Sequence, residues 1–238
     1  MTESPRRSPR VSICVPAHDQ VATGFTADLA RLVGWSTANL VSPGHLEGLQ
    51  LNFLTGTLIH TSRQRLAEAA LEHAPDYILW IDSDMRFPAD SLHRLLAHRE
   101  QFVGINYSTR GIPPDFTASK KVRFNADQFR VPCVTSEEST GLEAVEAMGF
   151  GMVLIRYDVF AALPEPRGEN RPWFWYDYCP DIDATVGEDV YFCRLAREAG
   201  FTPYVDHDLS KECKHVGTFE YRVDHVTALQ EADEPDSE

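Results

Sequence analysis

Apolar and polar positions alternate along the first half of the chain in blocks that switch between strand-like and helix-like spacing. Short, β-rich apolar runs predict strands over residues 11–15, 49–54, 77–81 and 102–107. Apolar residues at helical spacing predict helices over residues 23–35, 61–73 and 88–98. Thr61 or Ser62 is the expected cap of the second helix. This order predicts an α/β fold, with a mostly parallel central sheet flanked by helices.

The second half of the chain is less regular. Strands are expected over residues 152–155 and 202–205, and helices over residues 158–163 and 188–199, the last with Gly200 as its C-cap. No linker separates the two halves, so residues 11–222 are expected to form a single domain. Residues 1–10 are polar and residues 223–238 are acidic, and both segments are expected to be disordered.

The strand predicted over Tyr77–Ile81 runs directly into Asp82-Ser83-Asp84. Two carboxylates that follow a buried strand need partners. In an extended chain, residues two positions apart point to the same side, so Asp82 and Asp84 would point the same way. An acidic turn is the simple interpretation. A divalent metal site is the alternative, and the position favours it, because α/β sheets bind ligands beyond the carboxyl ends of their strands. Hard carboxylate oxygens suit Mn²⁺ or Mg²⁺.

Two further groups of residues carry possible chemistry. Glu188 and Asp189 open a helix, where acidic residues complement the helix dipole, but one of them could also act as a general base. His215 could join Asp84 on a metal, and this mixed nitrogen and oxygen set favours Mn²⁺. His207, which lies between Asp206 and Asp208, is the rival ligand. Cys213 beside His215 is only weak evidence for zinc.

Arg63 and an aromatic segment could both contact a ligand. Arg63 lies at the start of a predicted helix, where a diphosphate can use backbone amides and a guanidinium, whereas Arg65 is expected on an exposed helical face. Five aromatic residues occur within six positions, and they form either a lid or a platform for stacking sugars or bases. They are Trp173, Phe174, Trp175, Tyr176 and Tyr178.

Composition limits the partners of the 238-residue chain. Its net charge of −14 and its isoelectric point near 5.0 argue against broad binding to nucleic acid or anionic membrane. No apolar run is long enough for a membrane span or a signal peptide. Five cysteines without a CxxC pair fit a reducing cytoplasm. We expect a cytoplasmic monomer or homodimer.

The order of the motifs resembles a known family. Val11–Pro16 comes first, then Ser62-Arg63-Gln64, Ile81–Met85 with Phe87-Pro88, Gly149–Met152, Gly187–Cys193 and finally Cys213–Gly217. In this order they resemble glycosyltransferases of the GT-A fold, close to the family 2-like enzymes of bacteria and their phages. The resemblance spans roughly Val11 to Gly217, and it implies a Rossmann-like, mostly parallel sheet.

The resemblance implies a nucleoside diphosphate sugar as the donor and Mn²⁺ or Mg²⁺ as the cofactor. It implies that Asp84 ligates the metal, that Asp82 contacts the ribose or the metal, and that His215 completes the metal site. The remaining residues expected to border the donor are Pro16, Ala17, His18, Arg63 and Ser83. Gln64 departs from the Arg-Asn that often opens the family helix, and the acidic residue that recognises the base has no clear counterpart.

The resemblance also implies an acceptor site. It implies that Asp189 or Glu188 lies beside the acceptor and acts as the base in inverting members. The residues expected to border the acceptor are Gly149, Phe150, Gly151, Trp173 and Trp175. The motifs do not separate an inverting from a retaining mechanism, and they leave the donor sugar, its nucleotide base and the acceptor open.

The sequence is also compatible with other functions and with several acceptors. A nucleotidyltransferase would usually have a basic, Gly-rich loop after the first strand, but Pro16 to Thr23 contains no lysine or arginine. A non-catalytic nucleotide-sugar-binding module is a further alternative. Acceptors include a glycan, a small molecule or a hydroxymethylated DNA base, although the net charge disfavours DNA. The basic residues available for DNA are Lys120, Lys121, Arg123 and Arg130.

Overall fold

A computed structural model of the chain describes residues 7–111, 114–123, 129–166, 171–179 and 184–217. Disorder is expected for residues 1–10, but residues 7–10 are described: Arg7 pairs with Glu47 and Asp76, and Arg10 is the first residue of the first strand. Residues 1–6 and the acidic tail 223–238 lie outside the described residues. None of the helices in the described ranges has the length and apolar character needed to cross a bilayer.

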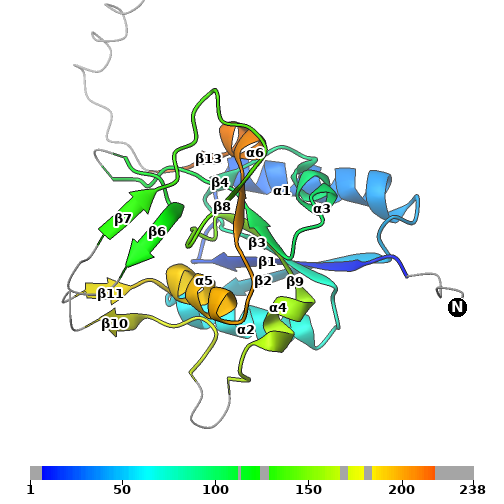
Figure 1. Ribbon diagram of the computed structural model, residues 1–238. Coiled ribbons are helices and arrows are strands. Elements are labelled where there is room, and N and C mark those ends of the chain that lie inside the picture. Colours follow the sequence, from blue (N-terminus) through cyan, green and yellow to red (C-terminus); the bar gives the residue numbers. More distant parts are fainter. Residues whose placement is uncertain (1–6, 112–113, 124–128, 167–170, 180–183, 218–238) are drawn as a thin grey trace, which may run out of the picture.

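A seven-stranded sheet forms the centre of the molecule, in the order β2-β1-β3-β9-β5-β12-β8 (Figure 1). Its strands are β1 (Arg10–Ala17), β2 (Gly48–Thr55), β3 (Tyr77–Ile81), β5 (Phe102–Gly104), β8 (Leu142–Ala144), β9 (Met152–Arg156) and β12 (Tyr204–Asp206). Strand β1 pairs in parallel with β2 and β3, and β12 pairs in parallel with β5. Strands β9 and β8 run the opposite way. The predicted mostly parallel sheet and the single domain are therefore confirmed.

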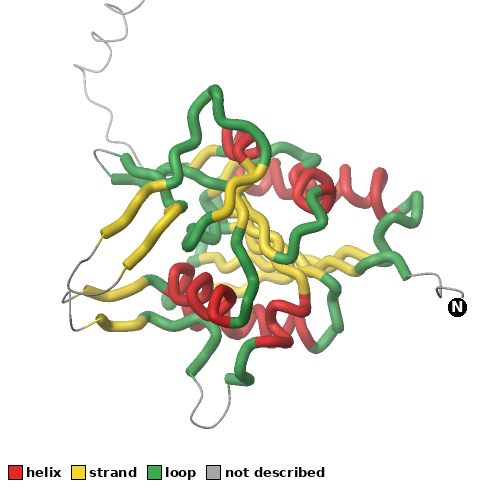
Figure 2. The backbone as a smooth tube through the Cα atoms, in the orientation of Figure 1, coloured by secondary structure: helices red, strands yellow, loops and turns green. Residues whose placement is uncertain are grey.

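Helices cover both faces of the sheet (Figures 1 and 2). On one face lie α1 (Thr23–Ser36), its π-helical continuation η1 (Thr37–Val41), α3 (Ser91–Ala97) and α6 (His207–Glu212). On the other face lie α2 (Ile59–Leu71), α4 (Tyr157–Ala162) and α5 (Glu188–Glu198). Strand β3 serves both cores, because Ile78 and Trp80 pack toward α2 and α5 whereas Leu79 and Ile81 pack toward α1 and α3.

Within the described ranges, three small antiparallel ribbons complete the fold, and the apolar pattern predicts none of them. They are β4 (Met85–Arg86) with β13 (Lys214–His215), β6 (Ser119–Arg123) with β7 (Phe129–Pro132), and β10 (Asp177–Cys179) with β11 (Ala184–Val186). Helix α6 is also unexpected. Its N-cap is Asp206, whose carboxylate accepts a hydrogen bond from the backbone nitrogen of Leu209 at 2.9 Å.

Several predicted boundaries need correction. Helix α2 begins at Ile59, so Thr61 and Ser62 lie inside it and no side chain caps its start. Helix α3 begins at Ser91 rather than at residue 88, and β5 ends at Gly104 rather than at residue 107. Gly200 follows α5 with a φ of +93°, which explains the glycine at this helix end.

Candidate functional site

The carboxyl ends of β1, β2 and β3 meet at one edge of the sheet. Ala17 and Thr55 are register partners, and the backbone nitrogen of Gly56 donates to the carbonyl of Ala17 at 3.0 Å. A cavity of about 240 Å³ opens there between Pro16-Ala17-His18, the segment from Gly56 to Ser62, and Asp82-Ser83-Asp84. Five of the six residues expected to border the nucleotide sugar therefore line one cavity, and Arg63, the sixth, contacts Asp82 beside it.

Arg63 is buried at the centre of this edge and bridges two elements. Its Nη2 donates to both carboxylate oxygens of Asp82, at 2.8 and 3.1 Å, and its Nε donates to Glu188 Oε1 at 3.2 Å. The guanidinium also lies over the rings of Trp80 and Phe150, 5.9 and 5.2 Å from their centroids. One buried cation thus ties the end of β3 to the start of α5.

Acidic groups outnumber basic groups around Arg63. Burial, together with the charges of Asp84 and Glu188, raises the pKa of Asp82 to about 6, although Arg63 opposes the shift. Burial and the neighbouring Glu188 also raise the pKa of Asp189. The Asp189 carboxylate accepts a hydrogen bond from the backbone nitrogen of Val190 at 2.7 Å. The cluster therefore favours either a bound proton or a bound cation.

A second pair, Asp84 and His215, lies at the mouth of the cavity. The β4–β13 ribbon places His215 opposite Met85, so that its Nε2 lies 3.3 Å from Asp84 Oδ2. Its Nδ1 donates to the carbonyl of Ser108 at 2.9 Å, because a carbonyl only accepts. When the His215 ring is neutral, its one proton is therefore on Nδ1, and an unprotonated Nε2 faces the Asp84 carboxylate. That arrangement needs a proton or a metal cation between the two atoms.

Arg110 is a second cation on the same carboxylate. Its Nη1 lies 3.1 Å from Asp84 Oδ2, and its side chain is more than half exposed. Burial acts to raise the pKa of Asp84, but His215 and Arg110 together lower it. The hydrogen bond to Asp84 in turn raises the pKa of His215. Asp84 therefore carries its negative charge at neutral pH.

Tyr107 contacts both His215 and the segment from Gly149 to Gly151, and the sequence pattern does not identify it. Its ring packs edge-on to His215 with centroids 5.1 Å apart, and its hydroxyl accepts from the backbone nitrogen of Gly151 at 3.1 Å. A Cβ on Gly149 would lie 3.0 Å from Tyr107 Cζ and closer still to its hydroxyl, and a Cβ on Gly151 would lie 2.6 Å from Cε1. The two glycines therefore make room for this ring, which lies just beyond β5.

The aromatic residues expected to bind the acceptor divide into two groups. Phe150 and Trp173 are buried in the core, so their rings offer no exposed stacking surface, which corrects that part of the expectation. The amides of Trp173 and Phe174 donate to Gln64 Oε1 at 2.9 and 3.4 Å, which gives Gln64 a structural role. The exposed members are Trp175, Tyr176 and Tyr178.

Two of the exposed aromatic residues, Trp175 and Tyr176, form a small surface group at the start of α2. Trp175 and Tyr176 pack edge-on to His60, with centroids 6.2 and 5.0 Å apart. Burial and the Glu188 carboxylate raise the pKa of Tyr176 to about 12. This contact places Tyr176 beside the carboxylate pair at the start of α5.

Other candidate residues lie elsewhere. His207, the rival ligand to His215, contacts Glu143 and Thr135 instead of Asp84. Arg65 is exposed on α2, as expected. The basic patch considered for DNA is partly neutralised, since Lys120 pairs with Glu143 and Arg130 pairs with Asp115. Tyr107 and Arg110, which the sequence interpretation missed, both follow β5, so the strand-end rule that selected Asp82 and Asp84 could have identified them.

Comparisons with known proteins support the fold. No protein-family model and no curated protein matches this sequence. The crystal structure of A197 from STIV aligns with a TM-score of 0.53 and 14% sequence identity, over 90% of this chain and 97% of that chain. A glycosyltransferase involved in the glycosylation of the major capsid of PBCV-1 aligns with a TM-score of 0.33 and 11% identity, over 64% of this chain and 63% of that chain. The likeness to A197 is one of fold alone, and the second alignment is too remote to support a statement about this chain.

Proposed function

We propose that the protein is a metal-dependent glycosyltransferase that moves a sugar from a nucleoside diphosphate sugar to an acceptor hydroxyl. One observation carries the proposal. Asp84 and His215 meet at the mouth of a cavity whose walls are the ends of β1 and β3 and the start of α2. The cavity of about 240 Å³ is below the ~300–1,000 Å³ of typical ligand pockets, so a nucleotide sugar would extend beyond it.

The charges of the site support a cation between protein and donor. Asp82, Asp84, Glu188 and Asp189 supply four carboxylates, while Arg63 and Arg110 supply two guanidinium groups. A diphosphate added to this surface would meet a net negative field. A divalent cation removes that conflict, and Arg110 is long and exposed enough to turn from Asp84 toward a phosphate.

The donor set fits Mn²⁺ or Mg²⁺. Asp84 and the Nε2 of His215 would hold the ion, with Asp82 close by, and the hydrogen bond from Nδ1 to Ser108 fixes the tautomer in which the neutral ring offers Nε2 to a metal. Such an ion, when bound, neutralises the charge that develops on the departing diphosphate. Arg63 holds Asp82 at the end of β3, and therefore keeps its carboxylate in place whether or not a ligand is present.

Asp189 is the better candidate for the base that takes the proton of the acceptor hydroxyl. Glu188 is buried and its Oε1 already accepts a hydrogen bond from Arg63, whereas Asp189 is only partly buried and has no side-chain hydrogen bond to that arginine among the described contacts. The raised pKa of Asp189 makes it a stronger base than an ordinary carboxylate. This role belongs to an inverting displacement.

The exposed aromatic group offers a surface for the acceptor. Trp175 and Tyr176 lie beside His60, and Tyr176 contacts Glu188 next to the proposed base. Sugar rings pack well on such faces. We therefore favour a carbohydrate, or a molecule that already carries a sugar, as the acceptor.

A thermal-shift experiment tests the donor site. The full chain is heated with a panel of nucleoside diphosphates, each with and without Mn²⁺ or Mg²⁺, and sugar release from the corresponding nucleotide sugars is then followed. We expect one diphosphate to raise the melting temperature only when metal is present, and Asp84→Asn to abolish that shift. A panel in which no diphosphate gives a metal-dependent shift would overturn the proposal.

A further inference from the structure

Cys133, Glu143 and His207 form a second cluster at the edge of the central sheet. Glu143 lies on β8, four strands along the sheet from β3, Cys133 follows β7, and His207 opens α6. Cys133 and His207 are buried, and one ligand atom from each of the three residues lies within 4.8 Å of the others. The chain therefore brings a thiol, a carboxylate and an imidazole together from three separate segments.

Two of the distances between these atoms are near those of a tetrahedral metal site. Glu143 Oε2 lies 3.0 Å from His207 Nε2 and 3.6 Å from Cys133 Sγ. Zinc bonds of about 2.3 Å to sulfur and about 2.0–2.1 Å to nitrogen or oxygen place tetrahedral ligand atoms about 3.3–3.6 Å apart. The third pair, Cys133 Sγ and a ring nitrogen of His207, lies within the 4.8 Å that all three ligand atoms share, so the three atoms surround one point.

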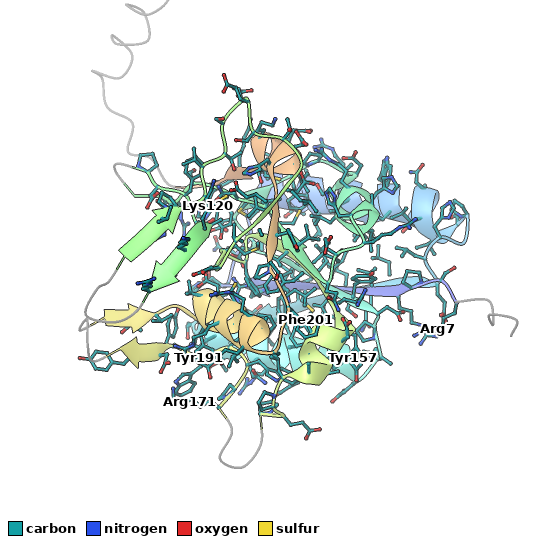
Figure 3. The ribbon with its side chains drawn as sticks, viewed as in Figure 1. Arg7, Lys120, Tyr157, Arg171, Tyr191 and Phe201 are labelled. Atoms are coloured by element: carbon teal, nitrogen blue, oxygen red, sulfur yellow. The ribbon has the colours of Figure 1, made fainter. Side chains whose placement is uncertain are left out.

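Neighbouring groups hold the cluster in the orientation that a metal needs. Thr135 Oγ1 lies 2.9 Å from His207 Nδ1, so it can accept a hydrogen bond from the protonated Nδ1 and leave Nε2 free to bind. Lys120 contacts the other oxygen of Glu143 at 2.5 Å, and Figure 3 shows Lys120 on the β6 strand. Asn106 donates to Thr135 Oγ1 at 3.0 Å and to the carbonyl of Cys133 at 2.7 Å. Each ligand therefore has a supporting contact.

The arrangement does not suit a nucleophilic cysteine. In such a site the imidazole takes the thiol proton directly, but here both the thiol and the imidazole contact the same oxygen of Glu143. A thiolate and an imidazole also favour a borderline-soft ion over the Mg²⁺ or Mn²⁺ that suits Asp84. The chemistry of the donor set therefore points to zinc.

We propose that Cys133, Glu143 and His207 bind Zn²⁺, with the fourth position open to water. Binding forms bonds from the metal to Sγ, Oε2 and Nε2, the thiol proton leaves to solvent, and the ring proton is carried on Nδ1 toward Thr135. Glu143 is only partly buried, which provides a path for the ion. The ion joins the end of the β6–β7 ribbon to the edge of the main sheet and to α6.

Cobalt substitution tests the site on the full chain. After chelation of bound metal, one equivalent of Co²⁺ is added and the ultraviolet and visible spectrum is recorded. We expect a thiolate-to-cobalt charge-transfer band with the strong visible bands of a tetrahedral site, both removed by one equivalent of Zn²⁺. Cys133→Ser should abolish the charge-transfer band, and Glu143→Gln, which preserves the size of the side chain, should weaken Co²⁺ binding at least tenfold.

Two control variants separate this site from the proposed donor site. Cys213→Ser removes the thiol near His215, and Asp84→Asn removes a carboxylate of the donor site, and both should keep the band. A wild-type protein without a charge-transfer band would overturn the proposal. A band that persists in Cys133→Ser, or that disappears in Cys213→Ser, would also overturn it. Because these readouts need no sugar transfer, they are independent of the proposed enzyme activity.

Discussion

His215 Nε2 lies 3.3 Å from Asp84 Oδ2, although 131 residues separate them in the chain. The contact depends on a ribbon of two residues on each side, in which His215 faces Met85 and the backbone nitrogen of Val216 donates to the carbonyl of Asp84 at 2.8 Å. A neutral His215 hydrogen-bonded to Ser108 brings two unprotonated atoms face to face, so either a proton on Nε2, which the raised pKa of His215 favours, or a metal cation is needed between them.

Replacement of His215 by glutamine should weaken Mn²⁺ binding at least tenfold, because one ligand is lost and the imidazole that Ser108 orients is removed. Electron paramagnetic resonance of free Mn²⁺, titrated with the full chain, measures the affinity directly. His45→Gln, at an exposed position, is the matched control and should bind Mn²⁺ as the wild type does. Equal affinity in His215→Gln and wild type would exclude His215 as a ligand.

Replacement of Arg63 by methionine should destabilise the fold by about 3–5 kcal/mol, because it leaves Asp82 and Glu188 as buried charges without their partner. Urea denaturation monitored by circular dichroism gives the free energy of unfolding. Arg65→Met, two residues along the same helix and exposed, should change that free energy by less than about 0.5 kcal/mol. A small effect at both positions would mean that Arg63 does not stabilise the carboxylates.

The sequence pattern predicts most of the strands and helices that position the site. Short apolar runs and helical spacing located β1, β2, β3 and α1, and the rule that ligands bind at the carboxyl ends of strands placed Pro16-Ala17-His18 and Asp82-Ser83-Asp84 together. These predictions succeed because strand and helix periods are local properties, and because parallel strands must end at the same edge.

Other features depend on tertiary contacts and could not be predicted in this way. An apolar run such as Met152–Ile155 looks the same in either direction, so the reversed β9 was not foreseen. Two-residue strands such as Met85–Arg86 have no periodicity. Arg63, in the second turn of α2, resembles a surface residue in sequence, and only the packing of β3 and α5 around it shows that it is buried.

Asp28 should make the stability of the protein fall at acidic pH. Burial acts to raise its pKa, but the hydrogen bonds from Arg86 and from the backbone nitrogen of Phe87, with the charge of Arg31, lower it below the ordinary 3.8. A carboxyl whose folded pKa is lowered stabilises the fold above its unfolded pKa, and this stabilisation is lost as the pH falls through the folded pKa. Asp28→Asn should therefore cost about 1–3 kcal/mol at pH 7.

The pH dependence of the stability of Asp28→Asn provides the control for this prediction. The difference in free energy of unfolding between wild type and Asp28→Asn should shrink steadily as the pH falls below 3.8, because the wild-type carboxyl then also becomes neutral. Urea titrations at several pH values measure it. A difference that is the same at pH 7 and at the lowest pH would show that charge at Asp28 is not the cause.

Gly149 and Gly151 should respond differently to changes in Tyr107. A Cβ at Gly149 meets the Tyr107 hydroxyl first, whereas a Cβ at Gly151 meets ring carbons at 2.6 and 2.7 Å. Each single alanine variant should lose about 1–3 kcal/mol of stability through overpacking. Tyr107→Phe removes only the hydroxyl, so it should recover part of the loss in Gly149→Ala and none in Gly151→Ala. Gly34→Ala, which meets no atom within 4 Å inside α1, should instead stabilise the fold by up to about 1 kcal/mol. Urea denaturation of the singles and doubles measures these couplings, and equal recovery at both glycines would show that the hydroxyl of Tyr107 is not what Gly149 accommodates.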